Sequence, residues 1–120
     1  MTHSHETPQW QAVKGTQAAL HDTITYLHDH LHDLETLTTD LYTKAPDAHI
    51  RLTLEASKAI RDKLAWLDRI AIDEANARDL LTRRATAEAS GYGPATIQRW
   101  SKRPIMTADG YYGPGTYTNK

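Results

Sequence analysis

Cationic side chains are concentrated in the last third of the chain. Residues 82 to 120 carry six Lys and Arg against two Asp and Glu, whereas residues 1 to 49 carry two against seven, together with all seven histidines. Residues 50 to 81 carry six of each, so the overall charge of -1 conceals a gradient from acidic to basic. A basic segment attracts polyanions such as nucleic acids, although a charge of +4 is also ordinary for a solvated surface.

This basic segment holds the local signals of two short helices that are separated by a sharp turn. Thr82 is suited to cap a helix that runs through Ser90, because a threonine oxygen can accept a hydrogen bond from the first turn. Gly91 has the backbone freedom that a reversal needs, and Pro94 suits the first turn of a following helix. The spacing predicts a helix-turn-helix over residues 82 to 103.

Five residues of this segment follow a pattern of small and apolar side chains. A small residue in the first helix is followed four residues later by glycine, then by an apolar residue, and then by two apolar residues in the second helix. These residues are Ala87, Gly91, Tyr92, Ile97 and Trp100. The pattern resembles the DNA-binding helix-turn-helix of excisionase-like and MerR-like regulators and of small phage and actinobacterial regulators, and the resemblance covers about residues 81 to 103.

Three positions depart from the family pattern. Thr86 and Ser90 stand where aliphatic or small apolar side chains are usual, and Gly93 stands where a Ser or Thr cap is common. The motif therefore has few apolar residues of its own. We expect Leu80, Leu81 and the end of the preceding long helix to cover it.

The resemblance implies that the helix from Pro94 to about Lys102 is a recognition helix in the major groove of DNA. Gln pairs with adenine, Arg pairs with guanine or a phosphate, and the methyl group of Thr contacts that of thymine. The implied base contacts are Ala95, Thr96, Gln98 and Arg99. The implied phosphate contacts, which set register without reading sequence, are Arg83, Arg84, Lys102 and Arg103.

The expected function is a sequence-specific DNA-binding protein, a small dimeric transcriptional regulator of the repressor type. The same parts would serve a phage or plasmid accessory factor in recombination, replication or packaging. The alternative is a helical-hairpin interaction or scaffold protein in which residues 82 to 103 are a packing element with solvated arginines. We expect no enzyme and no cofactor, because no nucleophile-base pair, phosphate loop or carboxylate dyad stands out.

Histidines on the first half of the chain are a weaker candidate site. His28 and His32 are four residues apart, so one helical face could present both to a metal ion. Their spacing fixes no third ligand, and both flank an apolar stripe as polar edge residues usually do. The sequence therefore predicts no metal site, with His28 and His32 as the weak candidates.

The element that must hold the basic segment is a pair of long helices over residues 8 to 81. Thr7 and Pro8 supply a cap and a first-turn proline, and the helix is expected to run to about Tyr42, although Gly15 could move its start to Thr16. Its stripe has alternating spacings of three and four residues, typical of a coiled-coil seam. The stripe is Trp10, Val13, Gln17, Leu20, Ile24, Leu27, Leu31, Leu34, Thr38 and Leu41.

A break at residues 43 to 47 precedes the second long helix, since Pro46 ends one hydrogen-bond ladder and suits the start of another. This helix is expected to continue to about Leu81, with Trp66 on its flank. Its apolar positions are Ile50, Leu54, Ile60, Leu64, Leu67, Ile70 and Ala71.

The expected fold is all-α: a long antiparallel helical hairpin, then a C-terminal helix-turn-helix, with residues 1 to 7 flexible. Residues 104 to 120 are a tail or a small wing around Asp109 and Gly110. Each long helix has only one narrow apolar seam, and no third element covers the hairpin from its other side. We therefore expect a homodimer through residues 8 to 81, and a monomer is the alternative. The homodimer would bury the flanking Tyr26, Leu37, Trp66 and Ile70.

Length and composition agree with one small domain. The chain has 120 residues, of which 24% are charged and 39% are apolar, and it has no cysteine. The absence of cysteine excludes disulfides and thiolate chemistry. Without a long apolar run, we expect no membrane span and a cytoplasmic location, on the nucleoid when DNA is bound.

Overall fold

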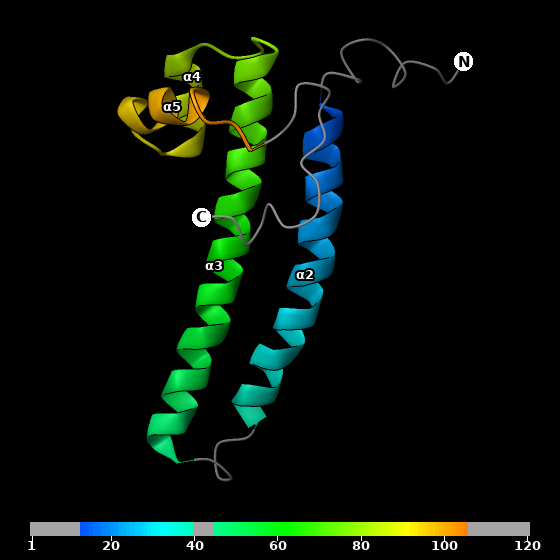
Figure 1. Ribbon diagram of the computed structural model, residues 1–120. Coiled ribbons are helices and arrows are strands. Elements are labelled where there is room, and N and C mark those ends of the chain that lie inside the picture. The colour runs from blue at the N-terminus through cyan, green and yellow to red at the C-terminus, as the bar shows by residue number, and fades with distance from the viewer. Residues whose placement is uncertain (1–12, 40–44, 106–120) are drawn as a thin grey trace, which may run out of the picture.

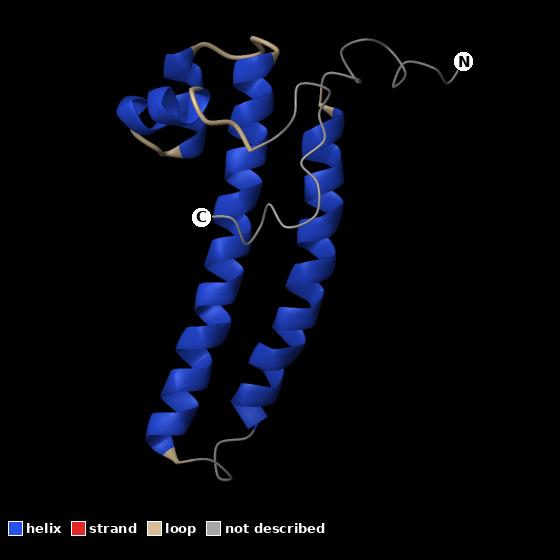
Figure 2. Cartoon of the chain, in the orientation of Figure 1, coloured by secondary structure: helices blue, strands red, loops and turns tan. Residues whose placement is uncertain are grey.

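The computed structural model describes residues 13–39 and 45–105. These residues form four α-helices and no strand: α2 (Lys14–Thr39), α3 (Pro46–Ala77), α4 (Arg83–Ser90) and α5 (Pro94–Ser101). The helices α2 and α3 make a long antiparallel hairpin, and the short helices α4 and α5 pack on α3 on the side away from α2 (Figure 1). The loops between α3, α4 and α5 are short (Figure 2). The predicted all-α hairpin is confirmed.

None of these four helices is long and apolar enough to cross a membrane. The expected start of the first helix at Thr7 and Pro8 lies outside the described residues, as does its expected end at Tyr42. The predicted wing around Asp109 and Gly110 also falls outside them. Pro46 opens α3, as its position in the sequence predicts.

Small side chains on α2 let it lie close to α3. Gly15, Ala19 and Thr23 recur every fourth residue and are buried, and Ala19 packs with Trp66 and Ile70 of α3. The hydroxyl of Thr23 is satisfied inside its own helix, where Oγ1 donates to the carbonyl of Ala19 at 2.7 Å. The core of the hairpin is therefore built from large side chains of α3 against a row of small residues on α2.

The contact between α2 and α3 uses only part of the apolar stripe that the heptad spacing predicts, since Val13, Gln17, Leu27 and Leu34 are half-buried. Leu20, Ile24 and Leu31 of that stripe remain exposed, whereas Trp66 and Ile70, which were expected to await a partner, are buried in the hairpin itself. Leu20 and Ile24 are each offset by one residue, about 100°, from the buried Ala19 and Thr23. The stripe alone is therefore not the seam of the hairpin: the small residues Gly15, Ala19 and Thr23 beside it are the buried residues of α2 and allow the closer approach.

A buried lysine lies in the same seam. The Nζ atom of Lys63 is 3.8 Å from the centre of the Trp66 ring and 5.3 Å from that of Tyr26. Burial lowers the pKa of Lys63, and the nearby carboxylate of Asp22 opposes that shift. Two aromatic faces thus stabilise a cation between α2 and α3.

The helix α3 ends earlier than its apolar pattern predicts. It stops at Ala77, and Asp79 adopts a left-handed backbone with φ of 54°. The amide of Leu80 then donates to the carbonyl of Ala75 at 3.0 Å, which is the long bond of a Schellman turn. Continuation to Leu81 is therefore wrong; this turn usually uses glycine, and the sequence has aspartate there.

We expect Asp79→Gly to stabilise the protein, because glycine adopts the left-handed conformation without the steric cost of a side chain. The free energy of unfolding should rise by about 0.5–1 kcal/mol in urea titrations. Asp79→Ala, which keeps a side chain and removes the carboxylate, is the control and should not stabilise. An unchanged or lower stability of Asp79→Gly would contradict the assigned turn.

Candidate nucleic-acid interface

The turn between α4 and α5 has the geometry that its residues predict. Oγ1 of Thr82 accepts a hydrogen bond from the amide of Ala85 at 3.0 Å and caps α4. The helix ends at Ser90, and Gly91 takes a left-handed backbone with φ of 82°. Pro94 opens α5. The predicted bounds of both short helices are therefore confirmed from Thr82 to Pro94.

The contact between the two short helices centres on Ile97, which is 0% exposed. Thr86 of α4 is also buried, and its hydroxyl donates to the carbonyl of Thr82 at 2.9 Å. Oγ of Ser90 accepts a hydrogen bond from the amide of Tyr92 at 3.2 Å. Both polar departures from the family pattern therefore find hydrogen-bond partners within the motif.

Tyr92 ties the turn to α5 and to α3. Its ring meets Trp100 edge to face, with 4.9 Å between ring centres, and its hydroxyl donates to Oδ2 of Asp68 at 2.9 Å. Burial raises the pKa of Tyr92 to about 12, and the hydrogen bond and negative charge of Asp68 act in the same direction. The phenol is therefore a neutral donor at physiological pH.

Two further residues of α3 hold the end of α5. The guanidinium of Arg69 lies 4.7 Å from the centre of the Trp100 ring and donates to the backbone carbonyl of Arg103. Oδ2 of Asp73 accepts a hydrogen bond from the amide of Ile105 at 2.6 Å, and its Oδ1 is 3.7 Å from Nε of Arg69. Arg69 and Asp73 thereby fix the orientation of α5 relative to α3.

Sequence reasoning missed the roles of Asp68, Arg69 and Asp73. Nothing in the spacing of these charged residues indicates that α4 and α5 cover their side of α3. Leu80 and Leu81 were expected to cover the motif, but both are about half exposed. Ile72 and Ala75 of α3 are buried, and they line a cavity together with Thr86 and Ala89 of α4.

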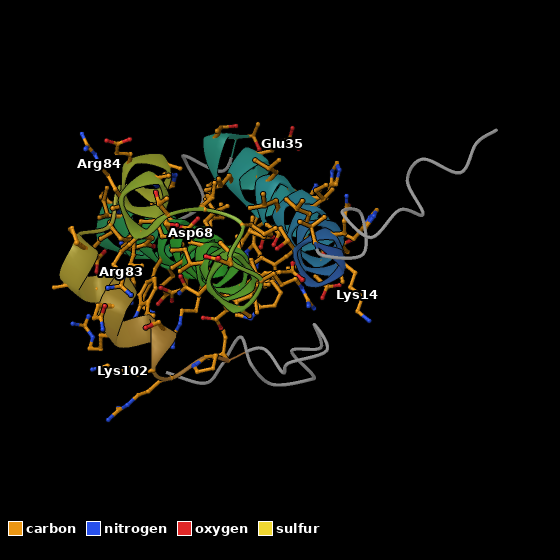
Figure 3. The ribbon with its side chains drawn as sticks, turned by 90° about the horizontal axis from the view of Figure 1, so that it is seen from above. Lys14, Glu35, Asp68, Arg83, Arg84 and Lys102 are labelled. Carbon is orange, nitrogen blue, oxygen red and sulfur yellow. The ribbon has the colours of Figure 1, made fainter. Side chains whose placement is uncertain are left out.

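Five cationic side chains are exposed on this unit: Arg83, Arg84, Arg99, Lys102 and Arg103. Figure 3 places Arg83, Arg84 and Lys102 on the side of the molecule away from α2. Nε of Arg84 is 3.3 Å from a carboxylate oxygen of Glu88, and both side chains are exposed. The unit therefore offers a cationic surface on two short helices.

The candidate base-reading residues all lie on α5 and differ in exposure. Ala95 and Arg99 are exposed, whereas Thr96 and Gln98 are half-buried. Among the motif residues, Ala87, Tyr92 and Trp100 are half-buried around Ile97. Arg99 is thus the most accessible long polar side chain of the four candidate base contacts.

His28 and His32 are both exposed on α2. Nδ1 of the neighbouring His30 is 3.6 Å from Oδ2 of Asp33. Within residues 13–39 and 45–105, no three His, Asp or Glu side chains are arranged to hold a metal ion.

Compared with models of protein families, with curated proteins and with solved structures, the chain matches none of them.

Proposed function

We propose that this protein binds duplex DNA in a sequence-specific manner and inserts α5 into the major groove. The observation that carries the proposal is the α4–α5 unit, which α3 holds at a fixed angle and which exposes five cations. By contrast, α2 carries one Lys and four Asp or Glu. A polyanion is therefore attracted to the α4–α5 end of the molecule.

In this proposal α5 reads bases and the flanking cations contact the backbone. Arg99 is suited to donate two hydrogen bonds to guanine, with Ala95, Thr96 and Gln98 beside it on the same helix. Arg83 and Arg84 begin α4, and Lys102 and Arg103 follow α5, so phosphates on both sides of the groove have partners. Occupying a site in this way is the action of a transcriptional repressor, with recombination, replication or packaging of DNA as alternative uses.

The test is selection of bound sequences from a random duplex pool, followed by affinity measurements over a range of salt. Arg99→Ala should cost about 1–3 kcal/mol on the selected site and relax its sequence preference. Lys102→Ala should weaken binding to all duplexes alike and lower the slope of log affinity against log salt by about one. Lys14→Ala is the control, because Lys14 is exposed on α2, across the molecule from Arg83 and Arg84 (Figure 3).

Failure to recover any duplex at low salt would overturn the proposal. Equal losses of DNA affinity for Lys14→Ala and Lys102→Ala would also count against it, because the end of α5 would then contribute no more to binding than α2 does. The rival function is an interaction protein whose working surface is the hairpin. The exposed aliphatic side chains on α2 and α3 favour that rival, and a protein that retains partners without binding DNA would support it.

A further inference from the structure

A row of large aliphatic side chains lies exposed along the α2–α3 hairpin. The row comprises Leu20, Ile24 and Leu31 on α2 and Ile50, Leu54 and Leu64 on α3, each 40–60% exposed. Monomeric proteins rarely leave a contiguous apolar surface of this kind uncovered. The core inside the hairpin is small by comparison, since its buried cluster consists of Ala19, Trp66 and Ile70.

All six side chains lie on one side of the hairpin. Each directly follows a residue that is buried or half-buried between the helices; Leu20 follows Ala19, and Leu64 follows Lys63. One residue is a turn of about 100°. The two helices run in opposite directions and face each other. A rotation of about 100° past the buried face therefore directs the three side chains of α2 and the three of α3 toward the same side of the hairpin. We call this surface the aliphatic face.

The other side of the hairpin is different in character. A groove of about 450 Å³ runs between α2 and α3 there, and Leu37, Leu52 and Ala56 line it together with His30, His32, Asp33, Thr36 and Glu55. Leu52 is 36% exposed in this groove, whereas the other large aliphatic residue there, Leu37, is half-buried. The two sides of the hairpin therefore differ: one carries the row of exposed aliphatic side chains, and the other carries a groove of mixed polar and apolar lining.

We propose that a second copy of this chain docks on the aliphatic face, forming a four-helix bundle in which both α4–α5 units lie at the same end. The six side chains of the aliphatic face span about 17 Å of α2, from Leu20 to Leu31, and about 21 Å of α3, from Ile50 to Leu64. A stable interface buries roughly 800 Å² on each partner, so contacts along the flanking parts of α2 and α3 would supply the remainder of that area.

Charges at the edges of the aliphatic face set the orientation. The α3 edge carries exposed Arg51, Lys58 and Arg61, of which Lys58 is paired with Asp62 (Nζ to Oδ2, 2.7 Å). The α2 edge carries exposed His21, His28 and Glu35, seven residues apart. With both α4–α5 units at one end, α2 of each copy lies against α3 of the other. In the opposite orientation α3 lies against α3, so the edge that carries Arg51 and Arg61 meets its own copy. Like charges in close apposition disfavour that second arrangement.

Glu35 has a specific partner in the same-end bundle. The contact of His49 with the carbonyl of Leu37, 2.8 Å long, shows which parts of α2 and α3 lie at the same level. At that level Glu35 of one copy faces Arg51 of the second copy. Within one chain, the two residues are on outer edges of different helices and point away from each other.

The arrangement has a consequence that rests on the proposed function. Helix-to-helix spacings of 8–10 Å place the two α5 helices of the bundle about 30 Å apart, on opposite flanks. One turn of duplex DNA is about 34 Å, so two adjacent major grooves are within reach. The selected site would then be a palindrome with half-sites one turn apart.

The first test is sedimentation equilibrium of the full chain, without DNA, from 1 to 200 µM. We expect a reversible dimer, and we expect Ile24→Gln combined with Leu54→Gln to weaken it by at least about 100-fold. Leu52→Gln, in the groove on the opposite side of the hairpin, is the matched control and should leave dimerisation unchanged. A wild-type chain that stays monomeric at 200 µM, or an equal loss with Leu52→Gln, would overturn the proposal.

The second test fixes the orientation and does not depend on the aliphatic variants. Glu35→Lys and Arg51→Glu should each weaken the dimer, and the double variant should recover most of the loss. The chain has no cysteine, so Asp47→Cys gives one site for a nitroxide label. The distance between the labels of the two copies should be below about 25 Å in the same-end bundle, against about 50 Å in the opposite orientation. The longer distance, or no recovery in the double variant, would overturn the same-end bundle. Because no DNA is present, failure of the dimer and failure of DNA binding are separate results.

Discussion

Replacing Glu74 with alanine is expected to lower the free energy of unfolding by about 3 kcal/mol, because this buried carboxylate caps a helix on the other side of the hairpin. Glu74 is 1% exposed on α3. Its Oε1 accepts hydrogen bonds from the amide of Thr16 at 2.8 Å and from the hydroxyl of Thr16 at 2.6 Å. Its Oε2 accepts from the amide of Gly15 at 3.2 Å.

The physical cause of this large effect is the first turn of α2. Amide groups at a helix start have no partner within the helix, and a carboxylate there is also favoured by the helix dipole. Removing the side chain leaves the donors of Gly15 and Thr16 unsatisfied and partly buried. It also removes the ion-pair partner of Arg78, whose Nε lies 3.6 Å from Oε2.

Urea titrations followed by circular dichroism at one fixed protein concentration would measure the loss. Thr16→Ala removes one of the three hydrogen bonds and should cost about 1 kcal/mol. Glu55→Ala removes an exposed carboxylate from the same helix and should cost less than about 0.5 kcal/mol. If Glu74→Ala were no more costly than Glu55→Ala, the interhelical cap would be refuted.

The second large effect is expected for Ile97→Ala, which should destabilise the α4–α5 unit by about 3 kcal/mol. Ile97 is completely buried, and around it the motif has mainly half-buried or polar side chains such as Thr86, Tyr92 and Trp100. A cavity at this position cannot be filled by neighbours that are already tied to α3 through Asp68 and Arg69. The unit is therefore expected to lose its fixed angle before the hairpin unfolds.

Hydrogen exchange of the α4 and α5 amides would measure this change, with the amides of α2 as an internal reference. Protection should fall in the α4–α5 unit and be retained in the hairpin. Leu81→Ala is the matched control, since Leu81 is also a large aliphatic residue but is about half exposed, and it should cost less than about 1 kcal/mol. Equal loss of protection in α2 and α5 would mean that the motif and hairpin unfold as one unit.

Glu74 and Ile97 together hold the cationic surface of the α4–α5 unit in place. Glu74 fixes the end of the hairpin from which the α4–α5 unit departs, and Ile97 fixes the two short helices to each other. Asp68, Arg69 and Asp73 then join that unit to α3. A change in any of these buried or half-buried groups alters the position of Arg99 without touching it.

Local features were predictable because their causes lie within a few residues of sequence. Thr82 as a cap, Gly91 as the left-handed turn and Pro94 as a helix start each depend on the chemistry of that residue alone. The end of α3 was not predictable in the same way. Asp79 takes a conformation that sequence reasoning assigns to glycine, so the early stop at Ala77 had no visible signal.

The sequence by itself determined that the chain has two long helices, a basic pair of short helices and an aliphatic stripe. Periodicity states that a helix has an apolar side, but it does not state which surface covers that side. The tertiary structure decided this question: Gly15, Ala19 and Thr23 allow the close contact with α3, so Leu20, Ile24 and Leu31 remain outside. Likewise, only the folded chain brings Glu74 to Thr16 and Asp68 to Tyr92, because such pairs are many residues apart and their meeting depends on the rotation of whole helices.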